Sequence, residues 1–206
     1  TGRAFCAGAD LKYVRATTAG DERATAAFLQ TVLAIMGRLE TFPKPVIASI
    51  NGLALAGGLE LVLCCDLVIA ARSARIGDAH ANCGLLRGGG GSVRLPRKIG
   101  PTRAKSLLYT GEFVPAEQLV AAGLVNEVVD DADLIGATER LVAKLVPKSP
   151  LVLRRMKALV DDGLEQPSET ALRLELLASE VHAHSHDLKE GLAAFEEKRA
   201  PRFLGR

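Results

Sequence analysis

The sequence contains no tryptophan, and its two tyrosines and six phenylalanines keep aromatic residues at 4% of 206 positions. With so few rings, the core has to be built from Leu, Val, Ile and Ala, and a hydrophobic content of 48% is enough for a sizeable one. The formal net charge of +2 argues against a surface that coats nucleic acid, although it is compatible with a local basic groove for phosphates.

Long apolar runs are also lacking, because Glu60, Asp66 or glycines interrupt them, and no signal peptide is evident. We therefore expect no membrane partner and no nucleic-acid partner. Cysteines are few, and Cys64 and Cys65 are adjacent within an apolar run. This placement favours buried thiols over a disulfide framework or a zinc site, and so predicts a reduced, cytoplasmic compartment.

Metal ligands at useful spacing are scarce as well. His182, His184 and His186 alternate, and only the first and last of them would share one face of a helix. A metal site there is an alternative to the solvated helix end that we favour. We expect no metal.

Hydrophobic periodicity predicts a mixed α/β chain. Residues 1–11 have the pattern of a strand that runs into a tight turn of glycine and alanine. Short buried strands are expected at 46–50, 67–71 and 124–129, and helices at 24–39, 59–65, 102–109, 116–122, 133–146, 151–164, 168–184 and 188–198. We predict an α/β core over residues 1–130, followed by a helical region over residues 131–206.

Two segments are suited to presenting backbone N–H groups to a ligand: residues 5–11, where a strand turns at small residues, and residues 54–60, a strand-to-helix junction. Glycine lets a backbone approach a ligand closely, and the first amides of a helix lack internal partners. One amide from each segment could form an oxyanion hole. Tight packing of strand against helix explains the same glycines, and spacing alone does not separate these interpretations.

The residues themselves resemble a known family. Residues 2–11 (GRAFCAGADL) and 51–61 (NGLALAGGLEL), followed by Cys65-Asp66, closely resemble the two signature stretches of the enoyl-CoA hydratase/isomerase (crotonase) family. Thr110-Gly111 and residues 195–203 (FEEKRAPRF) match later motifs in the same order. The resemblance covers the whole chain and implies a crotonase-like spiral of ββα units, with an acyl-CoA site in residues 1–130 and C-terminal helices that assemble a homotrimer or a dimer of trimers.

The resemblance also implies roles for individual positions. The backbone N–H groups of Ala9 and Gly57 match the pair that holds the thioester oxygen, and Glu60 matches the first catalytic glutamate of the hydratases. Coenzyme A, which enters as part of the substrate and not as a cofactor, would lie along residues 7–12. The implied substrate-binding residues are Ala7, Ala9, Asp10, Leu11, Lys12 and Gly88.

Three departures from the family pattern bear on function. His80 stands where the second catalytic glutamate is expected; histidine can move protons near neutral pH, so His80 could replace that carboxylate, or be a loop residue without a catalytic duty. Arg87 precedes the glycine cluster at 88–91, and we expect a solvated loop residue there, with binding of a substrate carboxylate or phosphate as the alternative. Family chains normally carry further strands and a helix before the point where this one begins.

The favoured reaction is the addition of water to a trans-2-enoyl-CoA, with Glu60 and His80 as catalytic residues. An enoyl-CoA isomerase, another acyl-CoA enzyme such as a thioester hydrolase, and a catalytically silent acyl-CoA-binding subunit are the alternatives. A peptidase is disfavoured because no serine stands at the turn around Gly57.

Overall fold

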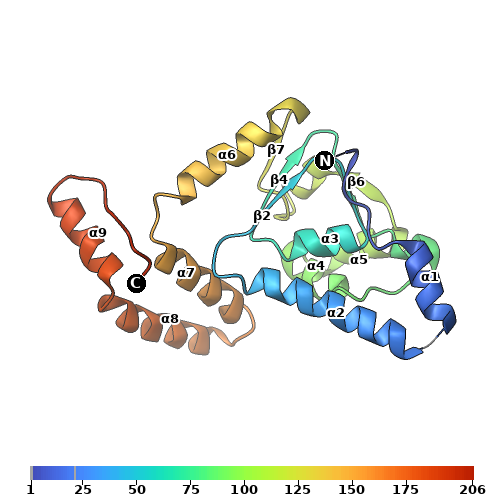
Figure 1. The fold of residues 1–206 in the computed structure, drawn as a ribbon, viewed down its shortest axis with the longest axis horizontal. Coiled ribbons are helices and arrows are strands. Elements are labelled where there is room, and N and C mark those ends of the chain that lie inside the picture. Colours follow the sequence, from blue (N-terminus) through green and yellow to red (C-terminus); the bar gives the residue numbers. More distant parts are fainter. Residues whose placement is uncertain (1, 21) are drawn as a thin grey trace. The chain divides into compact units, whose positions relative to one another are not determined.

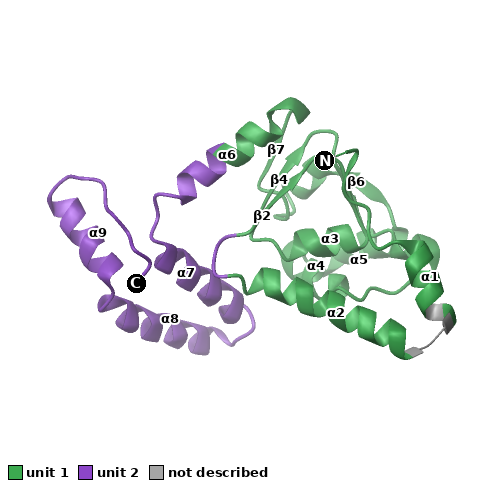
Figure 2. Cartoon of the chain, viewed as in Figure 1, with its two compact units in different colours: residues 1–42, 46–139 green, residues 43–45, 140–206 purple. Residues whose placement is uncertain are grey.

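A computed structural model of the chain describes residues 2–20 and 22–206. Within these residues the chain forms two compact units (Figure 2). Unit 1 comprises residues 1–42 and 46–139, and unit 2 comprises residues 43–45 and 140–206. The predicted functional division at residue 130 stays a prediction. The strand expected over residues 1–11 begins at Thr1, which lies outside the described residues.

Unit 1 contains two small sheets (Figure 1). Ala4–Cys6 (β1), Leu53–Leu55 (β3), Arg75–Gly77 (β5) and Phe113–Pro115 (β6) form a four-stranded sheet in that order. Ile47–Ile50 (β2), Leu67–Ala71 (β4) and Glu127–Val129 (β7) form a three-stranded sheet in that order. All pairs are parallel except β5 with β6. Parallel strands are usually covered on both faces, which explains why β4 is a continuous apolar run.

The helices of unit 1 follow the strands or connect them. They are Leu11–Gly20 (α1), Glu22–Glu40 (α2), Gly57–Leu63 (α3), Gly91–Ile99 (α4) and Pro101–Thr110 (α5), with Leu134–Leu145 (α6) running from unit 1 into unit 2. Single 3₁₀ turns occur at His80–Cys83, Ala116–Leu119 and Asp131–Asp133. The region expected to be a helix at 116–122 is therefore only a short 3₁₀ turn.

The core of unit 1 is aliphatic, as the lack of aromatic residues predicted. Its largest fully buried side chains include Ile50, Leu59, Leu63, Ile76 and Leu95. Helix α3 is the central helix, because five of its seven residues are buried. Cys64 and Cys65 are also buried, as expected for structural thiols, and burial raises the pKa of Cys64 to about 12. Cys64 therefore stays protonated and unreactive at neutral pH.

Unit 2 contains the end of α6, three further helices and a C-terminal tail. The helices are Pro150–Gly163 (α7), Ser168–Ala183 (α8) and His186–Glu196 (α9). Asp187, which is 2% exposed, ties the tail to the helices: it accepts hydrogen bonds from the N–H groups of Leu204 and Gly205 and from the hydroxyl of Ser149. A buried carboxylate is stable only when paired in this way, so Asp187 has a structural role.

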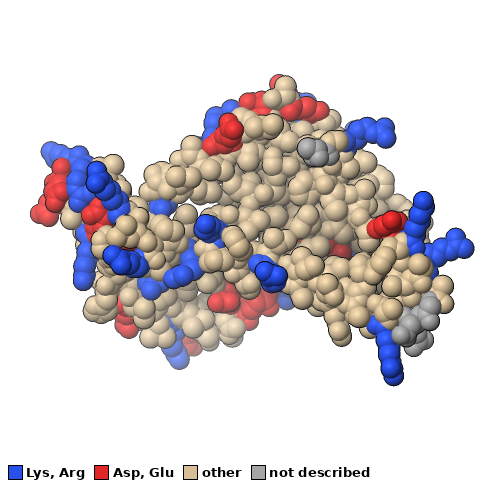
Figure 3. All heavy atoms as spheres, viewed as in Figure 1, with Lys and Arg blue, Asp and Glu red and all other residues tan. Residues whose placement is uncertain are grey.

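The surface carries mixed charges. On the face shown in Figure 3, Lys and Arg side chains are interspersed with Asp and Glu side chains. None of the helices in the described ranges combines the length and the apolar composition that a membrane span requires.

Candidate active site

A cavity of about 200 Å³ lies within unit 1, where four segments meet. Helices α1 and α2 supply an apolar wall, and the turns that follow β1, β3 and β5 supply the polar groups. Its lining residues include Ala7, Gly8, Ala9, Leu11, Phe28, Leu29, Val32, Gly57, Glu60, His80, Cys83, Gly88 and Gly89. An apolar cavity with a few convergent polar groups is the usual form of a small-molecule site.

Most of the residues that the sequence singled out meet in this cavity. Glu60, His80, Ala9 and Gly57 all line it, as do Ala7, Leu11 and Gly88. Asp10 and Lys12 do not line it. The Asp10 side chain instead accepts a hydrogen bond from the Lys12 N–H, at 2.8 Å, at the start of α1. The coenzyme A contacts predicted for Asp10 and Lys12 stay predictions.

The turns that carry Ala9 and Gly57 touch each other in the cavity wall. A Cβ atom placed on Gly57 would lie 3.6 Å from the Gly8 Cα and 3.8 Å from the Ala9 amide nitrogen. Ala56, with φ of 52°, turns the chain sharply between β3 and α3, a conformation that costs a non-glycine residue free energy and is often found at functional sites. Within residues 2–20 and 22–206, neither the Ala9 nor the Gly57 N–H has a protein acceptor. Their convergence on one ligand oxygen stays a prediction.

Glu60 is fixed by the glycine cluster that begins at residue 88. Its side chain is buried, and its Oε1 accepts hydrogen bonds from the N–H of Gly89, at 3.0 Å, and of Gly91, at 2.9 Å. A Cβ atom on Gly89 would lie 2.6 Å from Oε2 of the same carboxylate. Glycine at position 89 therefore lets the backbone approach Glu60 without displacing its carboxylate. No pattern in the sequence indicated this role for the cluster.

His80 is held by Asp78, a residue that the sequence analysis did not single out. The His80 Nδ1 lies 3.1 Å from the Asp78 Oδ1, and the His80 backbone N–H donates to the Asp78 carbonyl oxygen at 2.8 Å. Ala79 between them has φ of 59°, so the turn is tight. The hydrogen bond to Asp78 raises the pKa of His80 above its ordinary value, against the opposing effect of burial.

Arg87 corrects one expectation. Its side chain is only 13% exposed and therefore is not a solvated loop residue. Its Nε donates to the Asp78 Oδ1 and its Nη2 to the Asp78 Oδ2, both at 2.7 Å, and Nη2 also donates to the Leu108 carbonyl oxygen at 3.1 Å. This bidentate ion pair is charge-assisted and commits the guanidinium to Asp78, so nothing in the structure supports the substrate-binding alternative.

Asp78 is almost completely buried, with a side chain 1% exposed. Burial acts to raise the pKa of Asp78, but the hydrogen bonds from His80 and Arg87 outweigh it, and the pKa lies below its ordinary value. Asp78 is therefore an ionised carboxylate inside the protein. The only sign of it in the sequence is an acidic residue that directly follows Ile76-Gly77 and stands two residues before the histidine.

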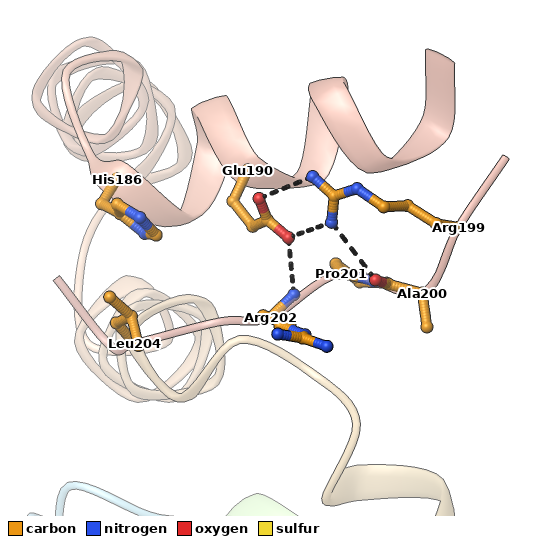
Figure 4. Close-up of a pocket in the computed structure, with 7 residues that line it drawn as sticks. All are labelled: His186, Glu190, Arg199, Ala200, Pro201, Arg202 and Leu204. Carbon is orange, nitrogen blue, oxygen red and sulfur yellow. Dashed lines mark hydrogen bonds and ion pairs between the residues drawn. The ribbon is translucent and has the colours of Figure 1, made fainter. Parts of the chain in front are cut away.

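A larger pocket of about 740 Å³ lies in unit 2 (Figure 4), but the Glu190 carboxylate and the Arg199 guanidinium in its lining are already paired with each other. The Glu190 carboxylate accepts two hydrogen bonds from the Arg199 guanidinium, at 2.6 and 3.0 Å, and one from the Arg202 N–H at 2.7 Å. The hydrogen bonds from Arg199 and Arg202 lower the pKa of Glu190 to about 2. Glu190 therefore anchors the C-terminal tail. The candidate active site is the cavity of unit 1, because the residues that the sequence singled out line it.

No group of three His, Cys, Asp or Glu residues in the described part of the chain is arranged to hold a metal ion. His186 instead lies 3.5 Å from Asp187, measured from Nδ1 to Oδ1.

Comparisons with known proteins agree on one family. The family model described as enoyl-CoA hydratase/isomerase matches residues 1–206. The chain is 37% identical to the crotonyl-CoA hydratase of Syntrophomonas wolfei over 204 residues, which cover 99% of this chain and 77% of that protein. It is also 37% identical to the human mitochondrial methylglutaconyl-CoA hydratase, covering 98% of this chain and 60% of the human protein.

Solved structures give the same result. An enoyl-CoA hydratase from Bacillus anthracis superposes with a TM-score of 0.93 at 40% identity, covering all of this chain and 79% of that one. An enoyl-CoA hydratase from Mycobacterium smegmatis superposes with a TM-score of 0.92 at 35% identity, covering 98% and 78% of the two chains. The predicted crotonase-like fold is thereby confirmed.

Proposed function

Because the chain belongs to the enoyl-CoA hydratase/isomerase (crotonase) family, we propose that it adds water to a trans-2-enoyl-CoA. One observation carries the proposal: Glu60, His80, Ala9 and Gly57 line a single cavity with an apolar wall. Such a site offers donors for a thioester oxygen, groups that can move protons, and an apolar surface for an acyl chain.

In the proposed reaction the Ala9 and Gly57 N–H groups hold the thioester oxygen while negative charge grows on it. Glu60 takes a proton from water as the water oxygen bonds to the β-carbon. The resulting enolate is then protonated at the α-carbon by the His80 imidazolium. Water contributes its hydroxyl group to the β-carbon and its proton to Glu60, and a proton returns from Glu60 to His80 through solvent to restore the site.

The substrate would be placed by both walls of the cavity. The acyl chain would lie against Phe28, Leu29 and Val32 of α2, and coenzyme A would lie along residues 7–12. The proposal uses no metal and no separate cofactor, since coenzyme A enters with the substrate. A cytoplasmic location belongs to the same proposal, because the buried Cys64 and Cys65 suit a reducing compartment.

The test is a turnover assay with crotonyl-CoA, followed by the loss of the absorbance of the conjugated enoyl thioester. We expect the absorbance to fall and 3-hydroxybutyryl-CoA to appear. With a trans-3-enoyl-CoA, an isomerase would instead raise the absorbance without consuming water. Tight binding of crotonyl-CoA without any turnover would support the silent binding subunit and contradict the hydratase.

Assembly through the C-terminal helices is a further part of the proposal. Within unit 2, α8 exposes a stripe of large apolar side chains, with Leu172 67% and Leu176 60% exposed. These residues are four apart and share one face of the helix, as an interface between copies requires. We propose a homotrimer or a dimer of trimers.

Replacing Leu176 with glutamate is expected to dissociate this assembly, because the substitution buries a charge at the interface between copies. Light scattering coupled to size-exclusion chromatography would measure a mass three or six times 21.8 kDa for the wild type and a lower mass for the variant. Glu127→Gln, at an exposed position of β7 outside the C-terminal helices, is the control and should leave the mass unchanged. A wild-type monomer at micromolar concentration would contradict the proposal.

A further inference from the structure

The Asp78–Arg87 ion pair lies next to His80. Its carboxylate accepts more hydrogen bonds than are needed to bury one negative charge. Four hydrogen bonds converge on the Asp78 carboxylate: two from the Arg87 guanidinium, one from the His80 ring and one from the His80 backbone N–H, at 3.2 Å. Arg87 alone would neutralise the buried charge. The contacts with His80 therefore call for a separate explanation.

We propose that Asp78 is a positioning residue for His80, holding its Nδ1–H so that Nε2 is the atom that transfers the proton, and that Arg87 moderates this effect. The inference rests on the proposed function and deepens it. It assigns roles to two residues that neither the family resemblance nor the comparisons assign.

The first step concerns the tautomer of His80. An ionised carboxylate can only accept hydrogen bonds, so the Nδ1 of His80 must carry a proton whenever it faces Asp78. Nε2 then holds the lone pair in the neutral ring and the second proton in the imidazolium. The tight turn at Ala79 keeps His80 beside Asp78. His80 can therefore exchange one proton at one defined atom.

The second step concerns the opposing charges around His80. Asp78 favours the imidazolium, and so does the more distant Glu60, whereas the positive charge of Arg87 disfavours it. Cys83, on the same 3₁₀ turn, is the other titratable side chain of the cavity lining. Because Arg87 is anchored on the Leu108 carbonyl oxygen as well as on Asp78, its charge stays close to the pair. Removal of Asp78 and removal of Arg87 should therefore move the titration of His80 in opposite directions.

The experiment follows the His80 ring signals by NMR as a function of pH in the full-length protein. In Asp78→Asn we expect the pKa of His80 to fall by about one pH unit, and in Arg87→Gln to rise, since a neighbouring opposite charge typically shifts a pKa by about one unit or more. His182, His184 and His186 serve as internal controls and should titrate as in the wild type.

The same variants are assayed for crotonyl-CoA hydration. If the His80 imidazolium is the acid, the rate is high below its pKa and is lost as the pH rises through that value. The alkaline limb of kcat/KM should therefore move to lower pH in Asp78→Asn and to higher pH in Arg87→Gln. We also expect kcat of Asp78→Asn to fall by about 10²-fold, with binding of butyryl-CoA within a few-fold of wild type, because Asp78 contacts His80 and does not line the cavity.

Asp78→Asn leaves Arg87 without its ionic partner and could unfold for that reason alone. The double variant Asp78→Asn/Arg87→Gln removes both charges and retains the shapes, so it replaces the single variant if needed. We expect its His80 to titrate below that of Arg87→Gln, because only the latter retains Asp78.

The outcomes separate the two proposals. Opposite shifts of the His80 pKa support the positioning role even if crotonyl-CoA is not hydrated, and in that case the hydratase proposal alone fails. Unchanged His80 titration in all variants, or shifts in the same direction, would overturn the positioning role whatever the turnover. If the NMR shifts are opposite and the alkaline limb stays in place, His80 is not the acid, and the part of the inference that assigns proton transfer to Nε2 is wrong.

Discussion

Replacement of Glu60 with glutamine is expected to lower kcat for crotonyl-CoA hydration by about 10²–10⁴-fold, the usual contribution of a general base. The amide has no basic oxygen, so it cannot take the proton from water. The fold should persist, because the glutamine carbonyl oxygen can accept the hydrogen bonds that Oε1 now accepts from Gly89 and Gly91. Initial rates at saturating substrate, together with thermal unfolding, measure both effects.

The matched control is Glu127→Gln, since Glu127 is exposed on β7 and does not line the cavity. This variant should have wild-type kcat and wild-type thermal stability. A Glu60→Gln enzyme with a rate within a few-fold of wild type would remove Glu60 from the mechanism. Loss of butyryl-CoA binding in Glu60→Gln would contradict the role in proton transfer in another way, by assigning the residue to ground-state binding.

The second large effect is expected at Gly58, where α3 packs against β1. A Cβ atom at this position would collide with the Cys6 carbonyl oxygen and lie 2.8 Å from the Cys6 carbonyl carbon. Because backbone atoms cannot rotate away, Gly58→Ala should push β1 off α3 and destabilise the protein by about 3 kcal/mol, at the upper end of the usual cost of overpacking. For a chain of this size that lowers the unfolding temperature by roughly 6–12 °C.

Gly57→Ala provides the matched comparison, because a Cβ atom there makes only ordinary contacts, the nearest at 3.6 Å. We expect unchanged stability in this variant. The new methyl group would, however, stand near the Ala9 amide nitrogen, so kcat/KM should fall by about 10²-fold, as when an oxyanion-hole donor is lost. If Gly57→Ala retained full activity, the predicted oxyanion hole would be wrong. If Gly58→Ala unfolded at the wild-type temperature, the close packing of β1 on α3 would be wrong.

Long periodic segments were predicted well from the sequence. The helix expected at 24–39 is Glu22–Glu40, and the strand expected at 67–71 is Leu67–Ala71. The C-terminal helices agree within about two residues at each end. These elements have a strong hydrophobic pattern, or they begin at clear caps such as Ser149, whose hydroxyl accepts from the Val152 N–H.

Some short elements were not predicted. Strands β5 and β6 have three residues each, too few for any periodicity to appear. Helix α1 was also missed, because Leu11, Tyr13 and Val14 are its only large apolar residues, too few for a helical period to appear. The strand expected at 124–129 is shorter, Glu127–Val129, since Leu124 and Val125 enter the core from a turn. In each case tertiary contacts decide the conformation.

The positions of Glu60 and His80 in one cavity follow from motif resemblance, whereas the support behind them does not. Asp78 and Arg87 are nine residues apart, on either side of the 3₁₀ turn, and their spacing in the sequence does not predict that they pair. The chemical role of a residue such as His80 is therefore easier to infer from the sequence than the buried ion pair that supports it.

The carboxylate of Glu60 accepts its hydrogen bonds from main-chain amides, and this affects how the site can change during evolution. Side-chain replacements elsewhere cannot delete an amide, so the orientation of Glu60 is shielded from most mutations apart from those that add a Cβ at Gly89 or Gly91. The opposite wall of the cavity is built from side chains of α2, such as Phe28, Leu29 and Val32. If the proposed function holds, descendants of this chain could therefore change which acyl groups they accept and still inherit the same orientation of Glu60.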